Sequence, residues 1–247
     1  MSSGLKIAAY YSLPSFSLGF CGPQDKTSRK TLYDFAVGKP VSENSVREIF
    51  KKFEAAYSYY KLIATKNNIT DPLDKQVVKA FWVGNSLLEK VTGNDLKKMA
   101  LSEFTKPGLL SQEEVSKKVK KIPLAAKPHH SFHVLFLGSV TKRVSLEGVM
   151  LDLCRIGWGK VAKVQSSKFK VQSIIIKYKP LILGRKIALG TEKEKEISWN
   201  QNIVPKVKIG GWVSFHWAQA CEVLTGEEVK NLEHYTKQTI FNVNKKP

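Results

Sequence analysis

The segment GKVAKVQSSKFKVQSIIIKY, residues 159–178, decides the fold class of the second half of this chain. Lysine and apolar residues alternate at 160–164 and again at 168–171, and a period of two is typical of a half-buried β-strand. The apolar run Ile174–Ile176 has no polar face, which suits a strand that is buried on both sides. We therefore expect strands at 159–164 and 168–178 that belong to a small β-barrel.

Three further segments beyond residue 128 have strand-like patterns, at 132–137, 144–153 and 212–217. After them, Thr225 and Glu228 have the spacing of a capping box, in which two side chains satisfy the first free N–H groups of a helix. The pattern predicts an OB-like β-barrel domain over residues 128–247 that ends in a C-terminal helix.

The first half of the chain has a helical period instead. Apolar residues recur at steps of three and four, and Asp71-Pro72 and the Ser111/Glu114 capping box mark helix starts. The fold class that we predict is α+β, with a mainly helical domain over residues 1–127. Its helices are expected at 42–63, 71–91 and 94–104 and from residue 111.

Composition and charge limit the possible functions. With 43% hydrophobic residues the 247-residue chain can bury a core, which excludes wholesale disorder. Its 40 Lys and Arg residues against 21 Asp and Glu residues give a net charge of +19, and 35 of the 40 are Lys. Specific phosphate and base recognition relies on Arg, so we favour a lysine-solvated surface over a nucleic-acid-binding or acidic-partner-binding one.

Cysteine usage and hydropathy indicate the compartment. Three cysteines without paired spacing argue against a disulfide framework, so we expect a reduced, cytoplasmic protein. The apolar stretch 7–21 is interrupted by Pro14 and has Phe20, not a small residue, before Cys21, so we expect a folded, partly buried segment and not a targeting signal. No apolar run reaches the length of about 18 residues that a membrane span needs, and no membrane insertion is expected.

The usual catalytic motifs are missing from the sequence: GxSxG, the P-loop, GxGxxG and HExxH. The segment PHHSFH, residues 128–133, nevertheless brings three imidazoles within five residues, and imidazole is a common ligand of borderline metals. On a strand, His129 and His133 share one face and His130 lies on the other. Cys21, in a glycine-rich turn, could join His129 and His133 in a metal-dependent enzyme; the alternative is a set of rings that cap backbone groups.

Two segments of the second half resemble the HypC-type hydrogenase maturation chaperones. Residues 154–161, CRIGWGKV, are similar to the family's Met-Cys-Leu start followed by Gly-Lys/Arg-Val. Residues 207–216, VKIGGWVSFH, resemble its V-K-x-G-D-Y-V-L-V-H segment, and residues 220–224 with the helix after them resemble its end. The whole chain also resembles an uncharacterised prokaryotic family.

The HypC resemblance implies a non-enzymatic, chaperone-like protein in [NiFe]-hydrogenase maturation. By it, Cys154 and His216 match the cysteine and histidine that hold a transient iron species, and such a soft Fe(II) unit suits a thiolate and an imidazole. The implied partners are a hydrogenase large-subunit precursor and a maturation scaffold protein. One alternative is a basic, OB-like nucleic-acid-binding module that stacks bases on the rings of Trp158, Trp212, Phe215 and Trp217.

Overall fold

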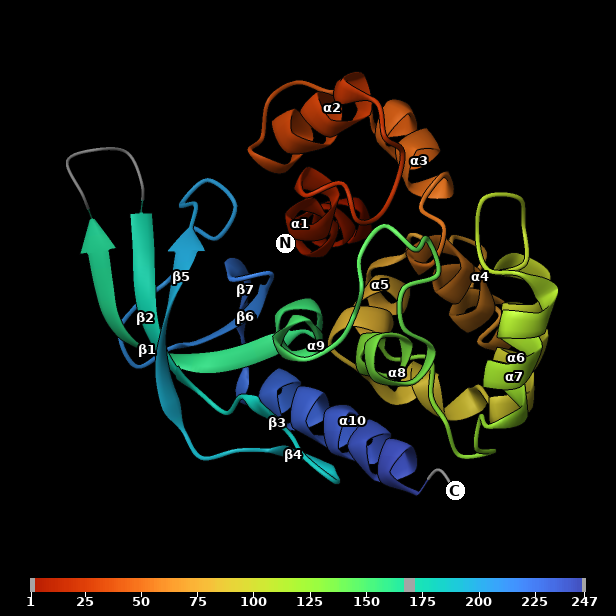
Figure 1. Ribbon diagram of the computed structural model, residues 1–247. Coiled ribbons are helices and arrows are strands. Elements are labelled where there is room, and N and C mark those ends of the chain that lie inside the picture. The colour runs from red at the N-terminus through yellow and green to blue at the C-terminus, as the bar shows by residue number, and fades with distance from the viewer. Residues whose placement is uncertain (1–2, 167–171, 246–247) are drawn as a thin grey trace.

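The computed structural model describes residues 3–166 and 172–245. Figure 1 shows the strands gathered on one side and most helices on the other, with α1 (Gly4–Ser17) and α9 (Val149–Cys154) between them. The remaining helices are α2 (Lys26–Ala36), α3 (Glu43–Lys51), α4 (Ala56–Lys66), α5 (Lys75–Trp82), η1 (Ser86–Lys90), α6 (Gly93–Glu103), α7 (Gln112–Lys120), α8 (His130–Phe132), η2 (His133–Leu137) and α10 (Gly226–Asn244).

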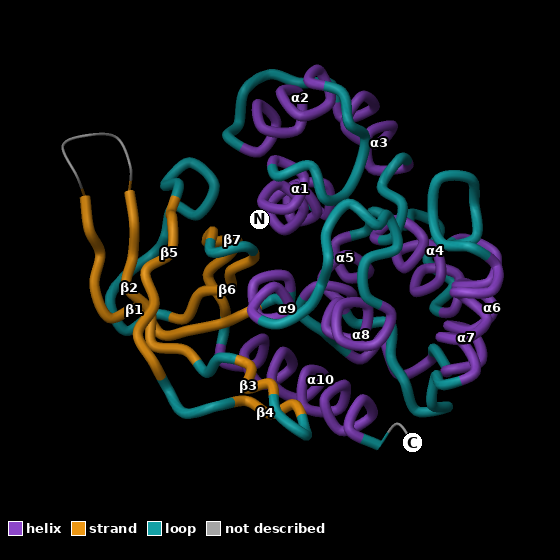
Figure 2. The backbone as a smooth tube through the Cα atoms, viewed as in Figure 1, coloured by secondary structure: helices purple, strands orange, loops and turns teal. Residues whose placement is uncertain are grey.

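Five strands form one sheet in the order β1-β2-β5-β7-β6: β1 (Gly157–Ser166), β2 (Gln172–Tyr178), β5 (Lys193–Trp199), β6 (Trp212–His216) and β7 (Gln219–Leu224). All pairs are antiparallel except β5 and β7, which are joined in parallel at Ser198 and Gln219. Since β1 also pairs with β6, the strands close on one another. A separate hairpin of β3 (Leu181–Leu183) and β4 (Ile187–Leu189) lies against α10 (Figure 2).

The α+β class, with helices first and a C-terminal helix last, is confirmed. Both capping boxes are present, Ser111 with Glu114 at α7 and Thr225 with Glu228 at α10. One hydrophobic core runs through both halves, from Leu5 in α1 to Tyr235 in α10. The division at residues 127 and 128 therefore stays a prediction from composition alone.

Helix α1 covers most of the segment 7–21, which is folded and partly buried, as expected. Eleven of its residues are buried, because the helix packs against α5 on one side and against β6 and β7 on another. Its Tyr11 hydroxyl hydrogen-bonds Ser214 on β6 at 2.8 Å and Glu222 on β7 at 3.2 Å. Among the described residues, no helix combines the length and apolar character needed to cross a bilayer.

The helix predicted over 42–63 is wrong in one respect, because it is broken into α3 and α4. The break at residues 52–55 places Glu54 beside the loop after α1, where its carboxylate accepts from the Gly22 N–H at 2.8 Å and from Arg143 at 2.6 Å. The break also lets Phe53 pack on Phe16 in α1. Tertiary contacts therefore outweigh the continuous helical period.

Two predicted strands are also wrong. Residues 132–137 are helical, belonging to α8 and η2, and every side chain from 132 to 137 is buried. A segment buried all round has no periodicity that separates helix from strand. Residues 144–153 form a loop and most of α9. The predicted strand at 168–178 is present as β2 from Gln172, and residues 168–171 lie outside the described part of the chain.

Candidate metal centre

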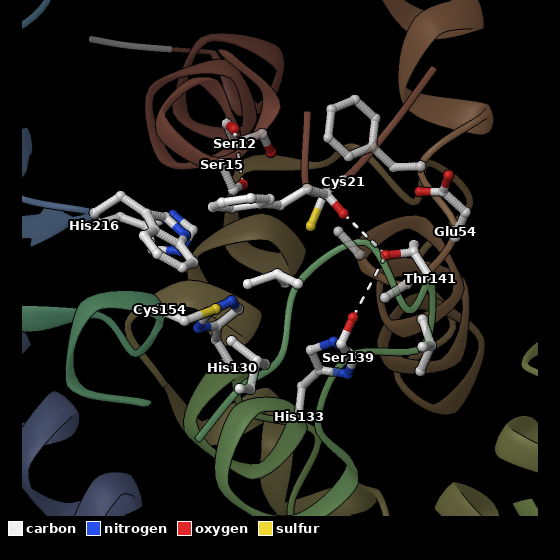
Figure 3. Close-up of a pocket in the computed structure, with 18 of the residues that line it drawn as sticks. Ser12, Ser15, Cys21, Glu54, His130, His133, Ser139, Thr141, Cys154 and His216 are labelled. Atoms are coloured by element: carbon white, nitrogen blue, oxygen red, sulfur yellow. Dashed lines mark hydrogen bonds between the residues drawn. The ribbon is translucent and has the colours of Figure 1, made fainter. Parts of the chain in front are cut away.

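Three side chains that could hold a metal meet in the interior: His130 at the start of α8, Cys154 at the end of α9 and His216 at the end of β6. One ligand atom from each lies within 4.8 Å of the other two, and all three residues are buried. Figure 3 shows them converging on a cavity from three different elements. For a tetrahedral zinc-type site, bond lengths of about 2.1 Å to nitrogen and 2.3 Å to sulfur require donor separations of roughly 3.3–3.6 Å, so any pair near the 4.8 Å limit would have to move closer on binding.

A backbone hydrogen bond orients His216. Its Nδ1 lies 2.7 Å from the Tyr11 carbonyl oxygen, which can only accept, so Nδ1 carries the proton. The Nε2 atom is then an unprotonated donor of a lone pair, and it is buried without a hydrogen-bond partner. Metal-ligating histidines are fixed in this way, by a hydrogen bond from the other ring nitrogen.

Aromatic rings position His130. Its ring lies 4.6 Å from the Trp82 ring and 5.1 Å from the His216 ring, measured between centroids. Its Nδ1 atom is buried and has no hydrogen-bond partner. Two imidazole nitrogens, one on His130 and one on His216, are therefore buried without a hydrogen-bond partner. Leaving buried polar atoms unpartnered is costly unless a ligand binds them.

Cys154 is held by a buried ion pair one residue away. Arg155 is 1% exposed, and its Nη2 lies 2.8 Å from Asp152 Oδ1. Asp152 also accepts from the Leu181 N–H at 2.9 Å, and Arg155 donates to the Lys179 carbonyl at 2.7 Å. These bonds fasten the end of α9 to the chain that leaves β2.

A backbone hydrogen bond brings the end of α9 close to His216. The backbone N–H of Trp217 donates to the Leu153 carbonyl at 2.8 Å, which joins the end of α9 to the turn that follows β6. Cys154 and His216 are therefore the neighbours of two residues that are bonded directly. This bond holds the backbones of Cys154 and His216 close together, and the rotamers of the two side chains then bring their ligand atoms together.

Burial keeps the metal-free site neutral. It lowers the pKa of His216 to about 4 and the pKa of His130 well below its ordinary value. It raises the pKa of the Cys154 thiol well above its ordinary value, and the nearby Cys21 adds to that rise. At neutral pH the site holds two neutral imidazoles and a thiol. A nucleophilic cysteine needs the opposite, a lowered pKa in electropositive surroundings, so the electrostatics suit a ligand set and not a cysteine–histidine dyad.

The three ligands line a cavity of about 50 Å³, which other candidates from the sequence also reach. Cys21 and His133 both line it, and burial raises the pKa of Cys21 to about 11. The His133 ring is tied to Tyr59, whose hydroxyl lies 3.3 Å from Nδ1. Both therefore lie around the ligand set and not within its 4.8 Å group.

His129 does not reach the cavity. Its Nδ1 accepts from the Ser131 N–H at 3.3 Å and so caps α8, and its ring stacks on Tyr235 at 5.6 Å. The prediction that His129 and His133 share one face, with His130 opposite, rested on a strand; because the segment is helical, His130 and His133 face the cavity instead. Helical spacing alone would not have separated His130 from His129, because they lie three and four residues from His133 and both spacings share a helix face.

The aromatic rings suggested for base stacking do not form an open platform. Phe215 is fully buried, and Trp217 lines the cavity with its ring 4.7 Å from Phe20. Trp158 and Trp212 are half-buried against the core. A nucleic acid could not reach Phe215 without unfolding the sheet.

Comparison with known proteins places the whole chain in one family. A family model described as Family of unknown function (DUF6390) matches residues 1–247, so the chain belongs to that family. This agrees with the expected whole-chain membership of an uncharacterised family and includes no likeness to HypC-type chaperones. No curated protein and no solved structure matches the chain.

Proposed function

We propose that this member of the family binds one divalent transition-metal ion through His130, Cys154 and His216, and that the ion keeps one coordination position open for a small ligand. The observation that supports this most directly is the convergence of three donor atoms, from three elements far apart in sequence, within 4.8 Å. Two of those residues carry buried ring nitrogens that have no other partner.

The donor set selects the kind of metal. One thiolate and two imidazoles suit borderline ions such as Zn²⁺, Fe²⁺ or Cu²⁺, and they disfavour Mg²⁺ and Ca²⁺, which take oxygen ligands. Three protein ligands with an open fourth position are typical of catalytic zinc sites, whereas structural sites are closed by four. When bound, the ion would supply Lewis acidity at that open position.

Metal stoichiometry and a thiolate signature test this proposal. Protein purified without a histidine tag under reducing, anaerobic conditions is loaded with Co²⁺, and we expect one ion per chain with a thiolate-to-cobalt charge-transfer band. Cys154→Ala should abolish the band, whereas Cys221→Ala, at another buried cysteine outside the cavity, should keep it. His130→Asn against His129→Asn gives a second matched pair of adjacent histidines. Loaded protein without the band, or with the band in Cys154→Ala, would refute the assignment.

A second candidate is transient iron carriage in [NiFe]-hydrogenase maturation, which the HypC-like segments imply. The closeness of Cys154 and His216 favours it, since these are the two residues that the resemblance selects. Delivery to a partner requires the ligands to become accessible, and here Cys154 is 8% and His216 1% exposed. Co-purification with a hydrogenase large-subunit precursor or maturation scaffold, both present and reduced, tests it; absence of binding to either refutes it.

A further inference from the structure

The cavity contains more unsatisfied polar atoms than a metal ion alone can use. Seven buried side-chain nitrogen and oxygen atoms of the described residues have no hydrogen-bond partner. Four of them belong to residues that line the one cavity: Ser12, His130, His216 and Trp217. A bound metal satisfies the two histidines. The Ser12 hydroxyl and the Trp217 indole N–H remain without a well-formed hydrogen bond, although the indole lies close enough to Cys154 to lower the pKa of its thiol. Buried polar groups in proteins are almost always partnered.

The charge of the loaded site indicates what that partner is. A divalent ion with one thiolate leaves a net charge of about +1 in a buried place, and an uncompensated buried charge is costly. Within the described part of the chain, the one carboxylate that lines the cavity is Glu54, which is already bonded to Gly22 and paired with Arg143. A monoanion at the open position would neutralise the site, whereas a neutral ligand would leave it charged.

The size and walls of the cavity restrict the anion further. About 50 Å³ is room for a ligand of roughly three heavy atoms, since one water needs about 10–15 Å³ on this measure. Apolar side chains such as Phe20, Phe81 and Val140 form much of the wall. Among the residues that the structure describes, no lysine or arginine lines the cavity, so the metal and hydroxyl or indole donors would carry the recognition.

The backbone at Trp217 is held in a conformation that needs a reason. Trp217 and Ala218 form the two-residue turn between β6 and β7, and their φ angles are 50° and 57°. Such turns normally use Asn and Gly, and the left-handed conformation costs other residues about 1 kcal/mol or more. Strain of this kind persists at functional sites where it fixes a side chain. Here it keeps the Trp217 indole in the cavity wall.

On the premise of the metal site above, we propose that the cavity binds a small monoanion as the fourth metal ligand, with Trp217 Nε1–H and the Ser12 hydroxyl donating hydrogen bonds to it. Trp217 acts here as a specificity-determining residue. It selects an acceptor ligand, while the cavity volume excludes larger anions.

Azide binding to the cobalt-loaded full-length protein tests this. We expect azide to shift the d–d bands saturably while the thiolate band persists, and we expect benzoate, a larger monoanion, to leave them unchanged. Trp217→Phe should weaken azide binding about tenfold or more at unchanged cobalt stoichiometry, because a hydrogen bond to a charged ligand is lost. Trp212→Phe, which changes a tryptophan at the other end of β6 and outside the cavity, should bind azide as the wild type does.

The possible results separate the two proposals. A thiolate band without any azide response overturns the anion site and leaves the metal site standing, whereas absence of the band overturns both. Equal azide affinity in Trp217→Phe overturns the role of the indole. If Trp217→Phe does not fold, Ser12→Ala takes its place, and unchanged azide affinity in that variant overturns the donor pair.

Discussion

Metal affinity should depend on pH with a slope set by a single proton. The Cys154 thiol has a pKa raised well above its ordinary value, so it is protonated at neutral pH and must lose its proton to bind a metal. The pKa of His216 is about 4 and that of His130 is well below its ordinary value, so both rings are already deprotonated at neutral pH. One proton is therefore released per ion, and the apparent association constant should rise about tenfold, or 1.4 kcal/mol, per pH unit around neutral pH.

Competition with a chromogenic chelator at about pH 6, 7 and 8, corrected for protonation of the chelator, measures this slope. Calorimetry in buffers of different ionisation enthalpy counts the released proton independently. Cys154→Ala, which still offers His130 and His216, should bind more weakly and lose the slope. A flat profile in the wild type would refute the reasoning, because it would mean that the thiol is ionised already or is not a ligand. A slope of two would mean that a histidine also releases a proton.

Three further predictions concern stability. Burial lowers the pKa of four histidines, His129, His130, His133 and His216, so below about pH 6.5 the native state binds fewer protons than the unfolded state. The free energy of unfolding should therefore be unaffected by these histidines above that pH, and it should fall by up to about 1.4 kcal/mol per pH unit for each of them as the pH drops towards 4. Urea unfolding of the metal-free protein measures this dependence. Ala218→Gly should raise the melting temperature, with a gain of about 1 kcal/mol from relief of the left-handed backbone, whereas Ala220→Gly on the adjacent strand should lower it; a loss in Ala218→Gly contradicts the strain argument. Asp152→Asn leaves the Arg155 guanidinium buried without its carboxylate and should cost about 3 kcal/mol or more, while Glu113→Gln on the surface should leave urea unfolding unchanged; equal effects would remove the buried pair as the anchor of α9.

The elements that sequence predicted well are those with local signals. Capping boxes at Ser111 and Thr225 depend on atoms within three residues of each other, so tertiary structure does not alter them. Strand β1 was predicted from the alternation of lysine and apolar residues at 160–164, whereas β6 is buried at four of its five residues and shows no alternating burial. The helix at 132–137 was missed because its side chains are buried on every side. The break between α3 and α4 was missed because it is stabilised by contacts with α1 that are distant in sequence.

The site was predictable only in part for a related reason. Cys154 and His216 were selected because two short segments, residues 154–161 and 207–216, resemble HypC-type chaperones. The structure brings the two side chains together. His130 against His129 was a choice between neighbours that depends entirely on whether the segment is a strand or a helix. The Tyr11 carbonyl could not be selected at all, and Trp217 was selected only as a base-stacking ring, because what these groups contact depends on where the backbone lies and not on residue type.

The bond between the Tyr11 carbonyl and His216 spans 205 residues and has a consequence for how the protein matures. During synthesis, the Tyr11 carbonyl can orient the His216 imidazole only after the chain has been made as far as residue 216. No fragment that ends before β6 can assemble the site, so a ribosome-bound intermediate would carry the first two ligands without the third. A metal ion bound by all three residues would therefore require that β6 has already been synthesised.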